Sequence, residues 1–136
     1  MTDLDELLSG LPRQPPASDE AIAASEVALQ MELPHEYVEF LKTTNGAEGF
    51  IGPSAYVMLW PVEQLDSLNH AYEIQKQAPG LLLFGSDGGG EAYGFDTRIP
   101  GWPIVQLPFV GMDWEDARLQ GESFKAFLRH LRSLIE

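Results

Sequence analysis

The segment LLLFGSDGGGEAYGFD, residues 81–96, constrains the fold of this chain more than any other. Its first four residues are large and apolar, and so short a run before a glycine-rich break is typical of a buried strand. Tyr93 and Phe95 lie two residues apart, the spacing of side chains on one face of a second strand. The glycines at 88–90 supply the positive φ angles that a tight connection needs. The segment therefore predicts an antiparallel β-hairpin.

The remainder of the chain alternates helical and strand-like patterns. Apolar residues recur every three or four positions in the helical segments, whereas strand-forming residues bounded by proline or glycine mark the strands. The C-terminal segment has the clearest helical spacing, with Phe124, Phe127, Leu128, Leu131 and Ile135 on one face. We expect an α+β fold. Its mainly antiparallel central sheet has strands near 55–60, 81–85, 91–96 and 102–108, packed by helices near 18–31, 34–44, 62–77 and 122–135.

Capping and breaking residues set the boundaries of these elements. Ser18 is a good N-cap, and proline forbids a helix in the linker before it. We therefore divide the chain into residues 1–17, a short helix with a proline-rich linker, and a single domain at 18–136. The helix after Ser18 is expected to bury Ala24, Val27, Ala28 and Met31. Two loops are expected, at 47–54, where Phe50 and Ile51 fold back onto the core, and at 110–121.

The net charge is the first indication of function. The chain has 21 acidic and 8 basic residues, a formal charge of −13. Nucleic-acid binding is excluded, because it needs clustered Lys and Arg to displace counterions. Half of the basic residues lie in 117–136, so the acidic field belongs to the body of the domain. Such a field steers a basic partner into contact, although solubility alone also accounts for it.

Composition also indicates the compartment. No apolar run approaches the length of a membrane span, and the acidic start MTDLDELLSG lacks the basic residues of a signal peptide. The absence of cysteine excludes disulfides, thiol nucleophiles and thiolate metal sites. We expect a cytoplasmic protein that makes no contact with a membrane.

Motifs for catalysis or ligand binding are incomplete. His35, His70 and His130 have no i+3 or i+4 spacing among them, which disfavours a zinc site. The glycine cluster leads into a strand and lacks the Lys-Ser or Lys-Thr of a phosphate loop. It also lacks the series of oxygen ligands that a calcium-binding loop needs. Ser86 does not lie in a nucleophile elbow. The residues alone therefore form no complete catalytic constellation, and we expect no metal and no cofactor; paired carboxylates stay open as an alternative, because acids are abundant.

Three connections carry the residues that we expect to bind a partner. A large aromatic residue among acids, as in Asp113-Trp114-Glu115-Asp116, is either an interface anchor or a cover for the core. We expect this loop, the 87–91 connection and the 49–54 loop to form one acidic face. The predicted partner-binding residues are Phe50, Asp87, Gly88, Gly89, Glu91, Asp113, Trp114, Glu115 and Asp116.

Three groups of residues together resemble one known family. They are Leu33-Pro34-His35-Glu36-Tyr37 with Phe40-Leu41 and Asn45-Gly46, the segment 84–96, and the terminal helix that begins Ser123-Phe124-Lys125-Ala126-Phe127-Leu128. From about Ser18 to its end, the chain resembles the SUKH superfamily, the domain of the Smi/Knr-type cell-wall regulators of fungi and of many bacterial proteins. The resemblance implies an α+β domain without enzymatic activity.

The resemblance also implies a role. Bacterial members look like immunity proteins that bind and neutralise a toxin, often a nuclease, so the implied partner is a basic toxin domain. An acidic surface suits the substrate groove of a basic nuclease. Fungal relatives imply instead a regulatory adaptor, because one fold supports several functions. A carboxylate-dependent enzyme is the third interpretation, and the sequence sets no oligomeric state.

Overall fold

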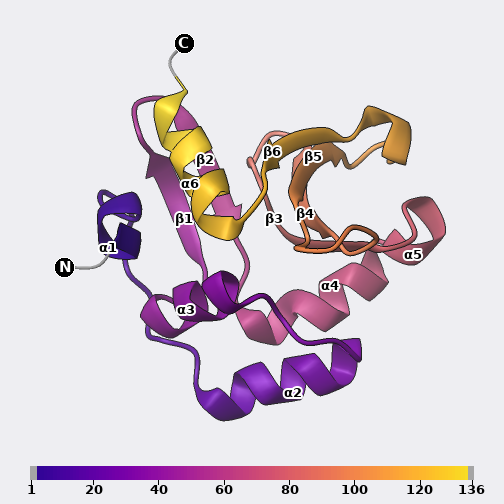
Figure 1. The fold of residues 1–136 in the computed structure, drawn as a ribbon, viewed down its shortest axis with the longest axis horizontal. Helices are drawn as coiled ribbons and strands as arrows, with labels where there is room; N and C mark the ends of the chain where they lie inside the picture. Colours follow the sequence, from indigo (N-terminus) through magenta and orange to yellow (C-terminus); the bar gives the residue numbers. More distant parts are fainter. Residues whose placement is uncertain (1–2, 135–136) are drawn as a thin grey trace.

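The computed structural model describes residues 3–134 and has the predicted α+β architecture (Figure 1). Its sheet is a meander in which every strand pairs antiparallel with the next one along the chain. Strands β2 and β3 pair through only two residue pairs, Met58 with Ser86 and Leu59 with Gly85. The sheet curls, and the β1–β2 hairpin diverges from the other strands (Figure 1). The strands are β1 (Ala47–Ile51), β2 (Ala55–Leu59), β3 (Leu81–Ser86), β4 (Glu91–Asp96), β5 (Ile104–Pro108) and β6 (Arg118–Gly121).

Within residues 3–134, six helices pack around this sheet, and serine side chains cap two of them. Ser18 accepts a hydrogen bond from the Ala21 amide at the start of α2, and Ser123 accepts one from the Ala126 amide at the start of α6. The expected helical residue Ile135 lies outside the described residues. The helices are α1 (Asp3–Leu7), α2 (Asp19–Leu29), α3 (His35–Thr43), α4 (Leu65–Ala71), α5 (Ile74–Gln77) and α6 (Phe124–Ser133), with 3-10 turns η1 (Val62–Gln64) and η2 (Trp114–Asp116).

Two strands replace segments that were expected to be loops. The segment 47–54 contains β1, and the segment 110–121 contains β6. Both strands are short and contain glycine, which weakens the intrinsic preference for a strand, and pairing with a neighbour overrides that preference. Ile51 is buried as expected, but Phe50 is not folded back onto the core, because adjacent strand residues point to opposite faces.

Two helix expectations also need correction. The segment 62–77 is not one helix, because Glu73 adopts a left-handed conformation with φ 52° and separates α4 from α5. In α2 the buried residues are Ile22 and Ser25, whereas Val27 is 78% exposed. Ala24 and Ala28 are exposed as well. Small alanines lie around the whole helix, so its apolar pattern does not single out the buried side.

The sheet is buried on both faces at the β3–β4 hairpin, where all six residues of β3 are buried. On one face Phe84, Tyr93 and Phe95 pack against Tyr37 of α3 and Phe127 of α6. As predicted, Tyr93 and Phe95 share a face. The other face forms a second cluster with Ile74, Ala78, Leu81, Leu83, Ala92, Val105, Leu107 and Met112.

Candidate functional site

The strand register places three connections at one end of the sheet. Met58 lies opposite Ser86, so the start of β2 extends past the end of β3, toward the β1–β2 turn. Glu91 lies opposite Pro108, so β5 also ends there. The connections at 52–54, 87–90 and 109–117 therefore leave the sheet from the same end.

The 87–90 turn is fixed by its own carboxylate. Asp87 Oδ1 accepts hydrogen bonds from the Gly89 amide at 2.7 Å and the Glu91 amide at 3.1 Å. The Asp87 amide donates to the Glu91 carbonyl at 3.0 Å. Asp87 therefore stabilises the turn, as such residues commonly do, and the exposed glycines leave its backbone accessible.

An aromatic pair lies on the outward face of the β1–β2 hairpin, beside this turn. Phe50 is 61% exposed, and its ring meets that of Tyr56 edge to face at 5.2 Å. The Tyr56 hydroxyl donates to Glu48 Oε2 at 2.9 Å, and this hydrogen bond raises the pKa of Tyr56. A Cβ atom on Gly88 would lie 3.0 Å from the Tyr56 ring, so the turn packs directly against it. We call Phe50, Tyr56 and Gly88 the aromatic patch.

The acidic β5–β6 connection lies at the same end of the sheet, where Glu115 and Asp116 are near Glu91 of β4. A shallow depression of about 530 Å³ is bordered by Glu91, Glu115, Asp116 and Arg118. Asp113 Oδ1 accepts a hydrogen bond from the Glu115 amide and so caps η2. The side chains of Asp113, Glu115 and Asp116 are exposed.

The acidic character of this end affects a neighbouring tyrosine. Burial is the main cause that raises the pKa of Tyr93 to about 12, and the charges of Asp87 and Glu91 add to it. Both carboxylates therefore act on the same buried hydroxyl.

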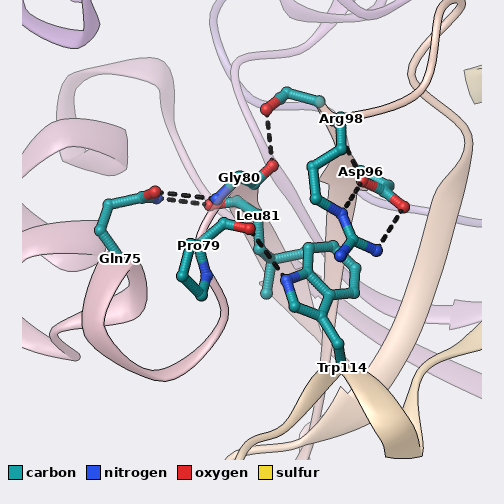
Figure 2. Close-up of polar contacts among 8 residues, drawn as sticks. Gln75, Pro79, Gly80, Leu81, Asp96, Arg98 and Trp114 are labelled. Atoms are coloured by element: carbon teal, nitrogen blue, oxygen red, sulfur yellow. Dashed lines mark hydrogen bonds and ion pairs between the residues drawn. The ribbon is translucent and has the colours of Figure 1, made fainter.

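Trp114 packs against the second core cluster, and its indole ring lies between Pro79 and Arg98 (Figure 2). Its indole nitrogen donates to the Pro79 carbonyl at 2.9 Å, at the start of β3 and thus at the opposite end of that strand. The Arg98 guanidinium lies 3.5 Å from the centre of the indole ring. Of the two interpretations of Trp114, the structure therefore favours the cover for the core.

Arg98 is itself held by a buried carboxylate. Arg98 Nε donates to Asp96 Oδ1 at 2.9 Å, and Nη2 donates to Oδ2 at 3.1 Å (Figure 2). These hydrogen bonds raise the pKa of Arg98. Among residues 3–134, Asp96 is the only buried carboxylate, and it is paired with a cation rather than with a second carboxylate.

The predicted site residues are thus divided by the fold. Phe50 and Gly88 each contact Tyr56; Asp87, Gly89 and Glu91 belong to one turn; and Trp114 is directed toward Pro79. Tyr56 is not among the predicted partner-binding residues. Its position between Ala55 and Val57 in an alternating strand is a signal for an outward side chain.

Two general features bear on chemistry. Within residues 3–134, no group of three or more His, Asp or Glu side chains is arranged to hold a metal ion. No helix of that part of the chain has the length and apolar composition needed to cross a membrane.

Comparison with known proteins identifies one relationship. The model of the SMI1 / KNR4 family (SUKH-1) matches residues 16–130. The match begins in the proline-rich linker and includes strands β1 to β6. No curated protein matches the chain.

Proposed function

The chain belongs to the SMI1 / KNR4 family (SUKH-1), and we propose that it is a non-enzymatic protein-binding domain that neutralises a basic toxin domain. The family supports an interaction between proteins. The toxin partner is our inference from the surface of this chain. The observation that carries it is the contact between Phe50, which is 61% exposed, and the half-buried Tyr56, at the end of the sheet where the acidic connections gather.

The proposed anchor is this pair rather than Trp114, whose indole is already engaged by Pro79 and Arg98. Aromatic residues dominate binding energy when a partner removes them from water. The Phe50–Tyr56 pair lies on strands, and its rings contact each other, so little conformational entropy is lost on binding.

The acidic residues near the patch supply the complementary charge. Glu48 and Asp87 flank the aromatic pair, and Glu91, Glu115 and Asp116 extend the acidic surface beyond it. A basic groove that binds nucleic acid would be attracted to this surface. The proposed mechanism is occlusion: the domain covers the groove and keeps the toxin's substrate out.

Charge steering has a measurable consequence. Association should slow markedly when the salt concentration rises from about 0.05 to 0.2 M, because ions screen exposed charges. A salt-independent association rate would favour the regulatory adaptor, which would bind mainly through apolar contacts.

The test is to recover the partner from the native cells together with the products of neighbouring genes, using tagged wild-type protein and the Phe50→Ala/Tyr56→Ala variant. Ile99→Ala is the matched control, because Ile99 is also an exposed apolar residue, at 48%, but lies between β4 and β5 at the other end of the sheet. We expect one stoichiometric basic protein, whose toxicity the wild type abolishes. Its recovery should fall with the double variant and persist with the control.

Other outcomes would change the assignment. Recovery of several signalling or envelope proteins would support the adaptor instead. If no partner is recovered, solubility becomes the better explanation of the charge. Equal recovery by all three proteins would contradict the role of the aromatic patch.

A further inference from the structure

A groove between α2 and the α4–α5 segment forms a second concave surface, at the opposite end of β3 from the aromatic patch. Its volume is about 730 Å³. In Figure 1, α2 and α4 lie beside each other below the sheet. Apolar side chains from three elements contribute to its walls. We call it the α2 groove; its lining includes Ala28, Met31, Asp66, Asn69, Ile74 and Leu81.

The main chain of β3 is not available to a partner in this groove. Asn69 donates to the Leu83 carbonyl at 3.0 Å and accepts from the Leu83 amide at 2.9 Å. Gln75 makes the same two-way contact with the Leu81 carbonyl and the Gly80 amide, each at 2.9 Å (Figure 2). The two side-chain amides thus replace a neighbouring strand. Strand addition is blocked, so a partner must be held through its side chains.

Asp66 is the least exposed of the charged side chains in the groove, at 37%, whereas Glu73 is 62% exposed. One oxygen of the Asp66 carboxylate, Oδ1, is buried and lies 3.2 Å from His70 Nδ1. Glu73 pairs with Lys76 at 3.1 Å. The side chains of His70 and Lys76 are both 79% exposed, so they project toward solvent. The interior of the groove is therefore more negative than its rim.

The end of α2 adds to this field. The carbonyl groups at a helix C-terminus carry a partial negative charge, which nearby cations stabilise. The last turn of α2 contains no basic residue, so this charge has no side-chain counterpart within the helix. Ala28, Leu29 and Met31 form the apolar wall of the groove at this end of α2.

We propose that the α2 groove binds a segment of a partner protein in which Lys or Arg lies beside a large apolar side chain. The apolar walls accommodate the hydrocarbon stem of the basic residue and its apolar neighbour. Asp66 and the carbonyl end of α2 receive the charged head. This surface is separate from the aromatic patch, so the domain carries two docking surfaces with different chemistry.

The probe is the capped peptide Gly-Leu-Arg-Leu-Gly, with Gly-Leu-Glu-Leu-Gly as its control, titrated into the isotopically labelled full chain. We expect the arginine peptide to shift the side-chain amide resonances of Asn69 and Gln75 and the backbone amide of Ala28. The glutamate peptide should leave them unchanged. Asp66→Asn should weaken binding about fivefold, the size expected for a partly exposed ion pair.

A pair of variants with the same charge change separates groove binding from general attraction to an acidic protein. Ala28→Arg should abolish binding because its side chain enters the groove. Ala24→Arg, one turn earlier on the same helix and outside the groove, should reduce binding only slightly. Amide dispersion of each variant confirms that it folds.

Three results would overturn the proposal: no shifts with the arginine peptide, shifts confined to Glu91 and Asp116, or equal losses for Ala28→Arg and Ala24→Arg. No toxin is used in this experiment, and the aromatic patch is unchanged in every variant. A negative result in the peptide titration therefore does not contradict the proposed function. A negative result in the partner-recovery experiment likewise does not contradict binding in the α2 groove.

Discussion

The hairpins β1–β2 and β3–β4 are built alike but lie in opposite environments. Every residue of β3 is buried, and the β3–β4 hairpin contributes to the clusters on both faces of the sheet. The β1–β2 hairpin buries Ile51, Val57 and Leu59 on one face and exposes Phe50 on the other. Antiparallel pairing alone therefore does not determine how a hairpin is used.

The β3–β4 hairpin is therefore the scaffold of the domain, whereas the β1–β2 hairpin supplies an outward surface. Two-sided burial leaves β3–β4 no side chain for a partner except at its turn, and fixes that turn in space. One-sided burial leaves β1–β2 an apolar face that folding does not require. A contiguous apolar patch on a protein surface marks an interaction site more often than a single exposed apolar residue does.

The largest contrast is between two phenylalanines. Phe84→Ala should reduce the free energy of unfolding by about 3–5 kcal/mol, because it leaves a cavity among Tyr37, Phe95 and Phe124. Phe50→Ala should cost less than about 1 kcal/mol, because the side chain is already 61% exposed. Urea unfolding of both variants measures the difference. Equal losses would show that the outward face of β1–β2 is part of the folding core.

Two carboxylates give the next contrast. Asp96→Asn should cost about 2 kcal/mol, because it weakens charged hydrogen bonds from Arg98 in a buried position. It should also change the fluorescence of Trp114, which lies against the Arg98 guanidinium. Glu48→Gln should cost no more than about 0.5 kcal/mol, because its partner Tyr56 is at the surface. A large effect of Glu48→Gln would mean that the aromatic patch is needed for stability.

Two glycines with similar backbone conformations test the contact between the hairpins. Gly88 has φ +78° and lies against Tyr56, whereas Gly111 has φ +68° and no atom within 4 Å of its expected Cβ. Gly111→Ala should cost about 1–2 kcal/mol, the penalty of a left-handed alanine. Gly88→Ala should cost more, because the new methyl group also displaces the Tyr56 ring. Equal losses in thermal unfolding would argue against a tight contact between the turn and Tyr56.

The sequence predicts the buried parts of this fold better than its edges. The β3–β4 hairpin and α6 are recognisable because their apolar residues are large and regularly spaced, and the structure confirms both. Strands β1 and β6 are formed by pairing with their neighbours, which no local pattern records. The break at Glu73 likewise depends on how α4 and α5 pack on β3.

The candidate site is only partly predictable from the sequence, because some of its contacts join segments that are far apart in the chain. Asp87 and the glycines form a turn through local hydrogen bonds, so residue types alone indicate it. The contact between Gly88 and Tyr56 joins residues 32 positions apart, counted from their numbers, and depends on the β2–β3 register. The direction of Trp114 depends on Pro79 and Arg98, which lie 35 and 16 positions away, counted from their numbers.

The smallest contrast is between tyrosines at alkaline pH. Burial raises the pKa of Tyr93 to about 12, whereas an unfolded tyrosine ionises near pH 10. Between these values the unfolded state loses a proton that the folded state keeps, so stability is complete below about pH 10 and falls as the pH rises toward 12. Burial raises the pKa of Tyr37 in the same direction.

Tyr93→Phe should therefore make the alkaline loss of stability less steep, by up to about 1.4 kcal/mol per pH unit. Tyr56→Phe should change it less, because a hydrogen bond to Glu48 at the surface, rather than burial, is the main cause of the raised pKa of Tyr56. Urea unfolding at several pH values between 9 and 12, as the pKa values indicate, measures both slopes. If Tyr56→Phe had the larger effect, the outward face of β1–β2 would be closed to solvent, and the distinction between scaffold and docking surface would be lost.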